Sequence, residues 1–134
     1  MKKINSIVII GNNEIDKFIH EKLLQNCGAE NILYFADAIS SLSYLQRQKV
    51  QPDIILIDLY MSPIDGIQFI DSYKHLRATN ILTQLFILSA SINPEDKKTA
   101  MRKGAGFIEK PLTREKLSEL LDTCTTCSIL NHSS

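Results

Sequence analysis

Three side chains with complementary chemistry stand at the ends of short apolar runs in this chain. The carboxylate Asp58 follows the run 54–57, the hydroxyl of Ser89 follows the run 85–88, and the ammonium of Lys110 follows the weaker run 106–108. In an open parallel sheet, ligands bind beyond the carboxyl ends of the strands, near the point where the strand order reverses. We therefore expect the three groups to converge in one crevice. Taken alone, Asp58 is more typical of a strand-end aspartate that forms a turn.

Another apolar run, Ile7–Ile10, leads into an uncharged turn made of Gly11, Asn12 and Asn13. A glycine turn between a strand and a helix can aim backbone N–H groups at an anion. The dinucleotide-binding fingerprint is absent, because no second or third glycine follows Gly11. What this turn does thus depends on the residues at the other strand ends.

The elements that must position these groups follow from hydrophobic patterning. Apolar runs at 7–10, 32–35, 54–57, 85–88 and 106–108 alternate with segments whose apolar residues recur at three and four positions. This predicts a βαβαβαβαβα chain. Near-continuous apolar strands indicate a parallel sheet covered by helices on both faces, so the predicted fold class is α/β.

The helical segments carry start signals and a predicted buried face. Asn13, Asn93 and Thr113 stand where side-chain caps are favoured, before the first, fourth and fifth helices. In the first helix, the spacing of its apolar residues predicts that Ile15, Phe18, Ile19 and Leu23 form the buried face. His20 and His75 are predicted to lie on helices and to face solvent.

From residue 7 to residue 122 the chain resembles the receiver domains of two-component response regulators. The resemblance rests on the segment 54–59, on Met61 and Asp65–Gly66, on Leu88–Ala90, and on the segment 104–111. Each motif is weak by itself, but their order and spacing together are specific. The resemblance implies a doubly wound, flavodoxin-like sheet of five parallel strands in the order 2-1-3-4-5.

In that family, the aspartate that ends the third strand accepts a phosphoryl group from a phosphohistidine, and Asp58 matches it. Ser89 matches the family's hydroxyl residue, Phe107 its aromatic switch residue, and Lys110 its lysine, whose bond to the following proline is typically cis. Phosphoryl transfer needs positioning and charge neutralisation, which a carboxylate and an ammonium supply. The resemblance implies output through the face formed by the fourth helix, fifth strand and fifth helix. For Phe107, a plain core position is the alternative.

The sequence departs from the family where Mg²⁺ should bind. The family ends its first strand in an acidic pair that holds the metal, and Gly11 and Asn12 stand at the matching positions. The remaining candidate ligands are Asp58, the Asn12 amide and the Tyr60 backbone carbonyl. Mg²⁺ takes one or two carboxylates plus waters, so this set predicts weak or absent metal binding.

Three functional hypotheses remain open. The first is a stand-alone receiver that accepts a phosphoryl group on Asp58 from a sensor histidine kinase or phosphotransfer protein and then docks to a downstream protein. The second is a degenerate receiver that binds partners without phosphorylation, which Gly11 and Asn12 favour. The third is a small enzyme on the same fold. An aspartyl phosphatase is disfavoured because Tyr60 stands where that class of enzyme needs an acid/base carboxylate. A flavin carrier is disfavoured because this chain lacks the phosphate-binding loop that such proteins need after the first strand. We therefore predict no enzymatic activity.

Composition narrows the setting. Fifteen basic and fifteen acidic residues cancel, so no global field favours nucleic acid or membrane. The first apolar run is too short for a signal peptide or membrane span, which predicts a cytoplasmic protein. Three cysteines form no disulfide framework, and Cys124 with Cys127 is only half a zinc site. We expect one domain over 1–122 and a short tail over 123–134.

Overall fold

The computed structural model describes residues 6–25, 28–76 and 82–122. It contains the strands β1 (Ser6–Ile10), β2 (Asn31–Phe35), β3 (Ile54–Asp58), β4 (Gln84–Ser89) and β5 (Gly106–Glu109). The helices are α1 (Glu14–Leu24), α2 (Ala38–Gln46), α3 (Gly66–Leu76) and α4 (Pro94–Arg102), and a further helix covers 114–122. In these ranges, no helix combines the length and apolar character that crossing a bilayer requires. The predicted tail, with Cys124 and Cys127, lies outside the described residues.

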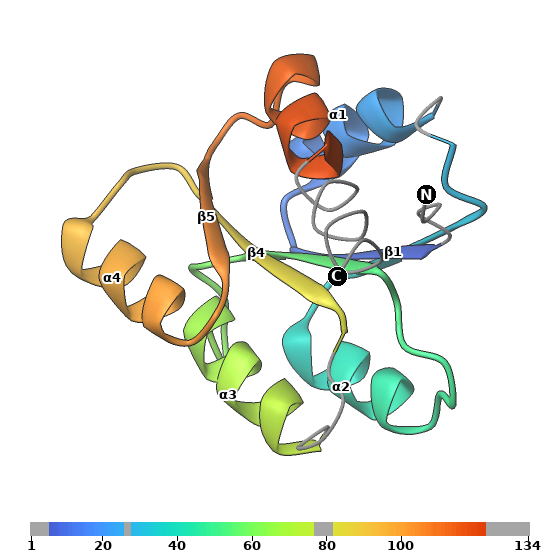
Figure 1. Ribbon diagram of the computed structural model, residues 1–134, viewed down its shortest axis with the longest axis vertical. Helices are drawn as coiled ribbons and strands as arrows, with labels where there is room; N and C mark the ends of the chain where they lie inside the picture. Colours follow the sequence, from blue (N-terminus) through green and yellow to red (C-terminus); the bar gives the residue numbers. More distant parts are fainter. Residues whose placement is uncertain (1–5, 26–27, 77–81, 123–134) are drawn as a thin grey trace, which may run out of the picture.

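All five strands pair in parallel, in the order β2-β1-β3-β4-β5 (Figure 1). The predicted fold class and strand order are therefore confirmed. β3 lies between β1 and β4, and all five of its residues are buried. A strand that is covered on both faces needs a continuous apolar run rather than an alternating one. The run 54–57 supplies it, and it brings Asp58 to the carboxyl end of the central strand.

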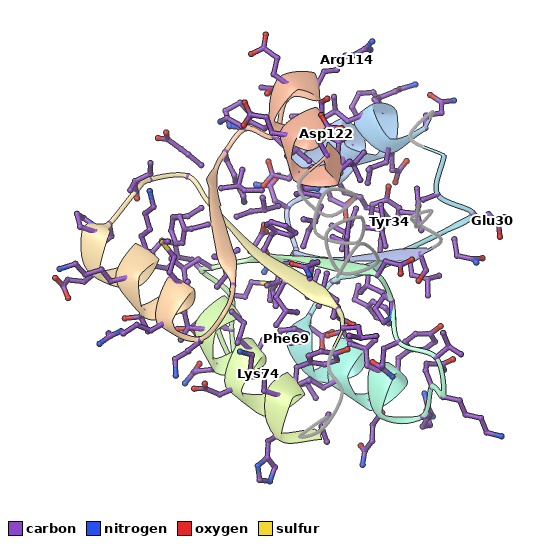
Figure 2. All side chains as sticks on the ribbon, viewed as in Figure 1. Glu30, Tyr34, Phe69, Lys74, Arg114 and Asp122 are labelled. Atoms are coloured by element: carbon purple, nitrogen blue, oxygen red, sulfur yellow. The ribbon has the colours of Figure 1, made fainter. Side chains whose placement is uncertain are left out.

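Helices cover the sheet on both faces, as Figure 1 shows. α2, α3 and α4 pack against one face around a core that includes Val8, Ile55, Ile57, Phe69 and Tyr73. α1 and the helix over 114–122 cover the other face around a second core, which includes Ile7, Ile9, Leu56, Leu117 and Leu120. Figure 2 shows Phe69 on the α3 side and Arg114 on the helix of the opposite layer. The alternation of side chains along each strand supplies both cores.

The predicted helix caps are confirmed. The side-chain oxygen of Asn13 accepts hydrogen bonds from the backbone N–H groups of Ile15 and Asp16 at 2.9 and 3.0 Å. Asn93 caps α4 in the same way. The hydroxyl of Thr113 accepts a bond from the N–H of Lys116 at 3.2 Å. Such caps satisfy donors that have no partner inside the helix. The Asn13 cap also fixes Asp16 in the first turn of α1.

The prediction for the buried face of α1 was wrong for two of its four residues. Ile15 and Phe18 are 73% and 60% exposed, and only Ile19 and Leu23 are partly buried. The face turned to the sheet instead carries Leu24 and His20, which is 3% exposed. The predicted solvent exposure of His20 is therefore also wrong, whereas His75 is exposed. Residues 16, 20 and 24 also recur at helical spacing. This set is more polar than the predicted face, yet it is the one that turns toward the sheet.

Candidate functional site

The carboxyl ends of β3, β4 and β5 meet at one edge of the sheet. Asp58 stands opposite Leu88 in the register, and Ser89 stands opposite Glu109. The N–H of Lys110 donates a hydrogen bond to the carbonyl of Ser89 at 2.7 Å. The peptide bond between Lys110 and Pro111 is cis, as the resemblance implies, and so is the one between Ser62 and Pro63. Parallel pairing therefore brings residues that are far apart in the sequence to a common edge.

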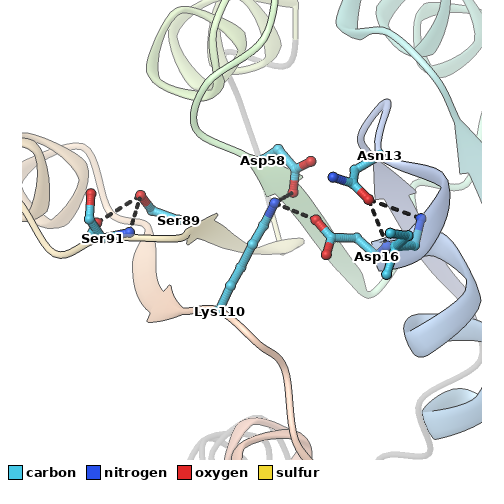
Figure 3. Close-up of polar contacts among 7 residues, drawn as sticks. Asn13, Asp16, Asp58, Ser89, Ser91 and Lys110 are labelled. Atoms are coloured by element: carbon cyan, nitrogen blue, oxygen red, sulfur yellow. Dashed lines mark hydrogen bonds and ion pairs between the residues drawn. The ribbon is translucent and has the colours of Figure 1, made fainter.

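The ammonium of Lys110 lies between two carboxylates (Figure 3). Its Nζ is 3.1 Å from Oδ1 of Asp58 and 2.6 Å from Oδ2 of Asp16 in the first turn of α1. The side chains of Lys110, Asp16 and Asp58 are 19%, 22% and 7% exposed. Charge-assisted hydrogen bonds are short and strong, and partial burial limits their screening by water and salt. The two contacts therefore hold the ammonium in a fixed place beside Asp58.

Burial and the ion pairs act on the acidity of these groups. Burial raises the pKa of the Asp58 carboxyl above its ordinary value, although the charge and hydrogen bond of Lys110 act in the opposite direction and Asp16 adds to the rise. For Lys110, burial lowers the pKa, but the hydrogen bond to Asp16 and the charge of Asp58 outweigh it, so the pKa is raised. The ammonium consequently stays charged at neutral pH.

Ser89 and Phe107 do not contact Asp58 through a hydrogen bond or ion pair. The buried hydroxyl of Ser89 donates a hydrogen bond to the carbonyl of Ser91 at 2.8 Å. Figure 3 shows these two serines at the end of β4, on the side of Lys110 opposite to Asp16. Phe107 is partly buried and packs against the core on the α2, α3 and α4 side. The structure thus brings together Asp58 and Lys110 and leaves Ser89 bonded within its own loop.

Comparison with known proteins places the chain in a family. The sequence model of the response regulator receiver domain matches residues 7–122. The chain belongs to this family. Receiver domains are signalling domains of two-component systems and are generally not enzymes. They interact with histidine kinases, phosphotransfer proteins and downstream targets.

Individual relatives show the same domain inside longer proteins. The chain is 26% identical over 125 residues to hybrid signal transduction histidine kinase L of Dictyostelium discoideum, covering 90% of this chain but 7% of that protein. It is 32% identical over 78 residues to the probable C4-dicarboxylate response regulator DctR of Halalkalibacterium halodurans, covering 58% and 33%. The chain therefore spans only a minor part of these relatives.

Solved structures agree on the fold. A two-component response regulator from Cytophaga hutchinsonii superimposes with a TM-score of 0.81 at 26% identity, covering 93% of this chain and 99% of that one. The chemotaxis protein CheY4 of Vibrio cholerae gives a TM-score of 0.77 at 20% identity, covering 91% and 99%. The second likeness, at this low identity, shows the fold alone.

Receiver domains bind Mg²⁺ at the phosphorylation site, but the donors of this receiver domain do not fit the ion. A Cβ built on Gly11 would lie 2.5 Å from Oδ2 of Asp58, so the first position of the missing acidic pair has no room for a side chain in this arrangement. Asn12 is exposed. In the described ranges, no group of three or more His, Cys, Asp or Glu residues could hold a metal ion. The roles of Asn12, Asp58 and the Tyr60 carbonyl as metal ligands stay predictions.

The phenol of Tyr60 contacts α4. It is 64% exposed, and its hydroxyl donates a hydrogen bond to Oδ2 of Asp96 on α4 at 3.1 Å. This hydrogen bond raises the pKa of the Tyr60 phenol. The contact joins the loop after Asp58 to the first turn of α4.

A cavity of about 170 Å³ lies beside Asp58, between the ends of β1 and β2 and the start of α1. Its lining includes Gly11, Asp16, His20, Tyr34 and Asp58. His20 has no hydrogen-bond partner among the described residues. Burial lowers its pKa, as does the charge of Lys110, while Asp16 acts in the opposite direction. At neutral pH the imidazole of His20 is therefore uncharged.

The buried His20 should make stability depend on pH. Because the pKa of His20 is lowered in the folded state, the unfolded chain binds more protons than the folded chain once the pH falls below about 6.5. We expect the free energy of unfolding to fall in that range, by at most about 1.4 kcal/mol per pH unit. Chemical denaturation of wild type and His20→Asn across this range measures the effect, which the substitution should remove.

The exposed His75 offers a matched control, since His75→Asn should leave the pH dependence unchanged. Because the pKa of Asp58 is raised, this group makes stability increase as the pH falls toward its ordinary value of 3.8, opposite to the effect of His20. The series is therefore repeated in an Asp58→Asn background, which removes this contribution. Equal pH profiles for wild type and His20→Asn in both series would contradict the prediction.

Asp16 is the site residue that sequence reasoning missed. Asp16 lies on a helix rather than at the end of a strand, and it stands outside the motifs that carry the resemblance. One signal was available: residues 16, 20 and 24 share a helical face that contains two polar side chains. Polar groups on a buried face need partners, and Asp16 finds Lys110.

Proposed function

We propose that this receiver domain accepts a phosphoryl group on Asp58 from a phosphohistidine of a sensor histidine kinase or phosphotransfer protein. The observation that supports it most is the buried Asp58 carboxylate, 3.1 Å from the Lys110 ammonium at the carboxyl edge of the sheet. A carboxylate in this setting needs no base to activate it, because it is the nucleophile in its ionised form. The ammonium neutralises charge on the transferred group.

In the proposed reaction, an oxygen of Asp58 forms a bond to phosphorus while the bond from phosphorus to the donor imidazole nitrogen breaks. The electron pair of that bond stays with the imidazole. Lys110 then pairs with the phosphoryl oxygens, and the Ser89 hydroxyl leaves the Ser91 carbonyl to donate to one of them. The space that Ser89 vacates admits Phe107. A local change of charge thus drives a change of packing.

The proposed output is the face formed by α4, β5 and the helix over 114–122. Phe107 lies on β5 and packs against the core beneath α4. A shift in its packing therefore reaches this face. A downstream protein that binds one arrangement better than the other would read the state of Asp58. The partners and the cytoplasmic location stay predictions.

A second candidate is an interaction module that works without phosphorylation. Gly11 favours it, since this position carries no charge and the carboxylate of Asp58 occupies the space that a side chain there would need. Under this hypothesis the Lys110 ion pairs are structural and the output face is fixed in one state.

Treatment with phosphoramidate, followed by intact mass measurement, separates the two candidates. We expect a labile adduct with the mass of one phosphoryl group, absent in Asp58→Ala. Asp71→Ala is the matched control, because Asp71 also contacts a lysine, Lys103 at 2.8 Å, but lies on the exposed side of α3. It should keep the adduct. Failure of the wild type to form any adduct at saturating donor, with or without Mg²⁺, would move the assignment to the second candidate.

A further inference from the structure

The cation that pairs with Asp58 is a side chain of the protein itself. The Lys110 ammonium contacts Asp58 from β3 and Asp16 from α1, and the contact with Asp16 is the shorter one. Asp16 and Lys110 are 94 positions apart, so the fold alone brings them together. The three side chains together carry one net negative charge. This arrangement already gives each carboxylate a positive partner.

The same arrangement opposes a bound divalent ion. Mg²⁺ needs near-octahedral oxygen ligands, usually one or two carboxylates with several waters. Here both nearby carboxylates already face an ammonium, which would repel a second cation at short range. Gly11 adds no ligand, and any side chain there would displace the carboxylate of Asp58. The site therefore has a cation but lacks a set of free ligands.

We infer that Lys110, held by Asp16, takes the place of the metal, so that phosphoryl acceptance at Asp58 proceeds without a divalent ion. The inference rests on the proposed function for its acceptance step, but the weak metal binding follows from the ion pairs alone. Asp16 is a positioning residue: it acts on Asp58 through Lys110. Because the Asn13 cap holds the backbone of Asp16 in the first turn of α1, the carboxylate of Asp16 projects from a fixed position as the second partner of the ammonium.

In the acceptance step, the Asp58 oxygen bonds to phosphorus and the donor nitrogen leaves with its electron pair. Phosphoramidate is a suitable co-reactant because its scissile bond also joins phosphorus to nitrogen. When this bond breaks, the phosphoryl group stays on Asp58, and the nitrogen keeps the electron pair and leaves as ammonia with a proton from solvent. Lys110 neutralises the phosphoryl oxygens and keeps its proton throughout. No oxidant or metal enters this balance.

The first measurement is an Mg²⁺ titration followed by backbone amide chemical shifts around Asp58, without any phosphodonor. Wild type should show no saturable shift at millimolar Mg²⁺. Lys110→Met frees both carboxylates, so this variant should gain a saturable shift. Adding Asp16→Asn to it should lower the affinity for Mg²⁺ by about tenfold or more, because one of two carboxylate ligands is lost. Saturation of the wild type would overturn the inference, and the wild-type result decides even if a variant does not fold.

The second measurement compares the rate of adduct formation from phosphoramidate in Mg²⁺ and in a metal chelator. Equal rates, within about twofold, support the inference, since a twofold change is well below the tenfold that 1.4 kcal/mol represents. An adduct that forms only with Mg²⁺ overturns the inference and leaves the proposed function standing. No adduct in either condition overturns the proposed function, and the titration then decides the question of metal binding separately.

The third measurement tests Asp16 through Lys110. The hydrogen bond to Asp16 raises the pKa of Lys110. Titration of the Lys110 side chain by nitrogen chemical shift should therefore give a lower pKa in Asp16→Asn, and Asp16→Glu should restore part of the difference. A role of Asp16 confined to the stability of α1 would leave this pKa unchanged, and an unchanged pKa would overturn the assignment of Asp16 as a positioning residue.

Discussion

Replacing Lys110 with methionine is expected to lower the free energy of unfolding by about 3 kcal/mol at neutral pH, because removing one member of a buried ion pair leaves the other uncompensated. Here two carboxylates, Asp16 and Asp58, lose the same ammonium. Methionine keeps most of the side-chain length and apolar stem, so the loss reports charge more than packing. Urea unfolding followed by circular dichroism measures the change.

The loss should shrink as the pH is lowered. Lys110 opposes the rise in the pKa of Asp58 that burial causes, so its removal raises that pKa further. A carboxyl whose pKa is raised in the folded state binds more protons than in the unfolded chain above its ordinary value of 3.8. Stability then increases as the pH falls through that window, since the folded state takes up the proton.

A second lysine serves as the control. Lys103 makes an ion pair of 2.8 Å with Asp71, but the two side chains are 32% and 57% exposed. Exposed pairs contribute about 1 kcal/mol or less, so Lys103→Met should cost far less than Lys110→Met. Adding Asp58→Asn to Lys110→Met should recover part of the lost stability. Equal costs for the two lysines would show that the Lys110 ion pairs are not a buried network.

The sheet and the contact between Asp58 and Lys110 could be predicted from the sequence for a simple reason. Strands that are buried on both faces have few options other than continuous apolar runs, and parallel topology places their carboxyl ends at one edge. The runs at 54–57 and 106–108 therefore located both residues without reference to their side-chain partners. No knowledge of side-chain packing was needed, because strand pairing alone places Asp58 and Lys110 at the same edge.

The contact with Asp16 could not be predicted in the same way, because two helical faces of α1 compete. Counting apolar residues selects Ile15 and Phe18, yet these lie exposed and His20 is buried. The side chain of Asp16 gains a short ion pair by facing the sheet. That gain depends on where Lys110 lies, 94 positions away. Periodicity describes one segment at a time and does not contain this information.

Replacing Gly11 with alanine is expected to destabilise the wild type by about 1–3 kcal/mol, the usual cost of overpacking. The added Cβ would lie 2.5 Å from Oδ2 and 3.0 Å from Cγ of Asp58. Asp58 cannot move freely, because Lys110 holds its other oxygen at 3.1 Å. Relieving the clash at Oδ2 of Asp58 would therefore weaken the ion pair at its Oδ1.

In an Asp58→Ala background the same substitution should change sign. The three atoms nearest to the new Cβ all belong to the Asp58 carboxyl group, and Asp58→Ala removes them. Without them, alanine in place of glycine restricts the unfolded chain and stabilises by about 0.4–1 kcal/mol where the backbone permits it. A double-mutant cycle from urea unfolding of the four proteins gives the coupling between positions 11 and 58.

Gly106 is the matched control, since a Cβ there would lie 2.6 Å from the ring of Phe86 rather than near Asp58. Gly106→Ala should destabilise equally in both backgrounds. If Gly11→Ala also costs the same with and without the Asp58 carboxylate, the close approach does not limit position 11. If the coupling is found, an acidic residue cannot be restored at position 11 by substitution alone, because Asp58 would first have to leave Lys110.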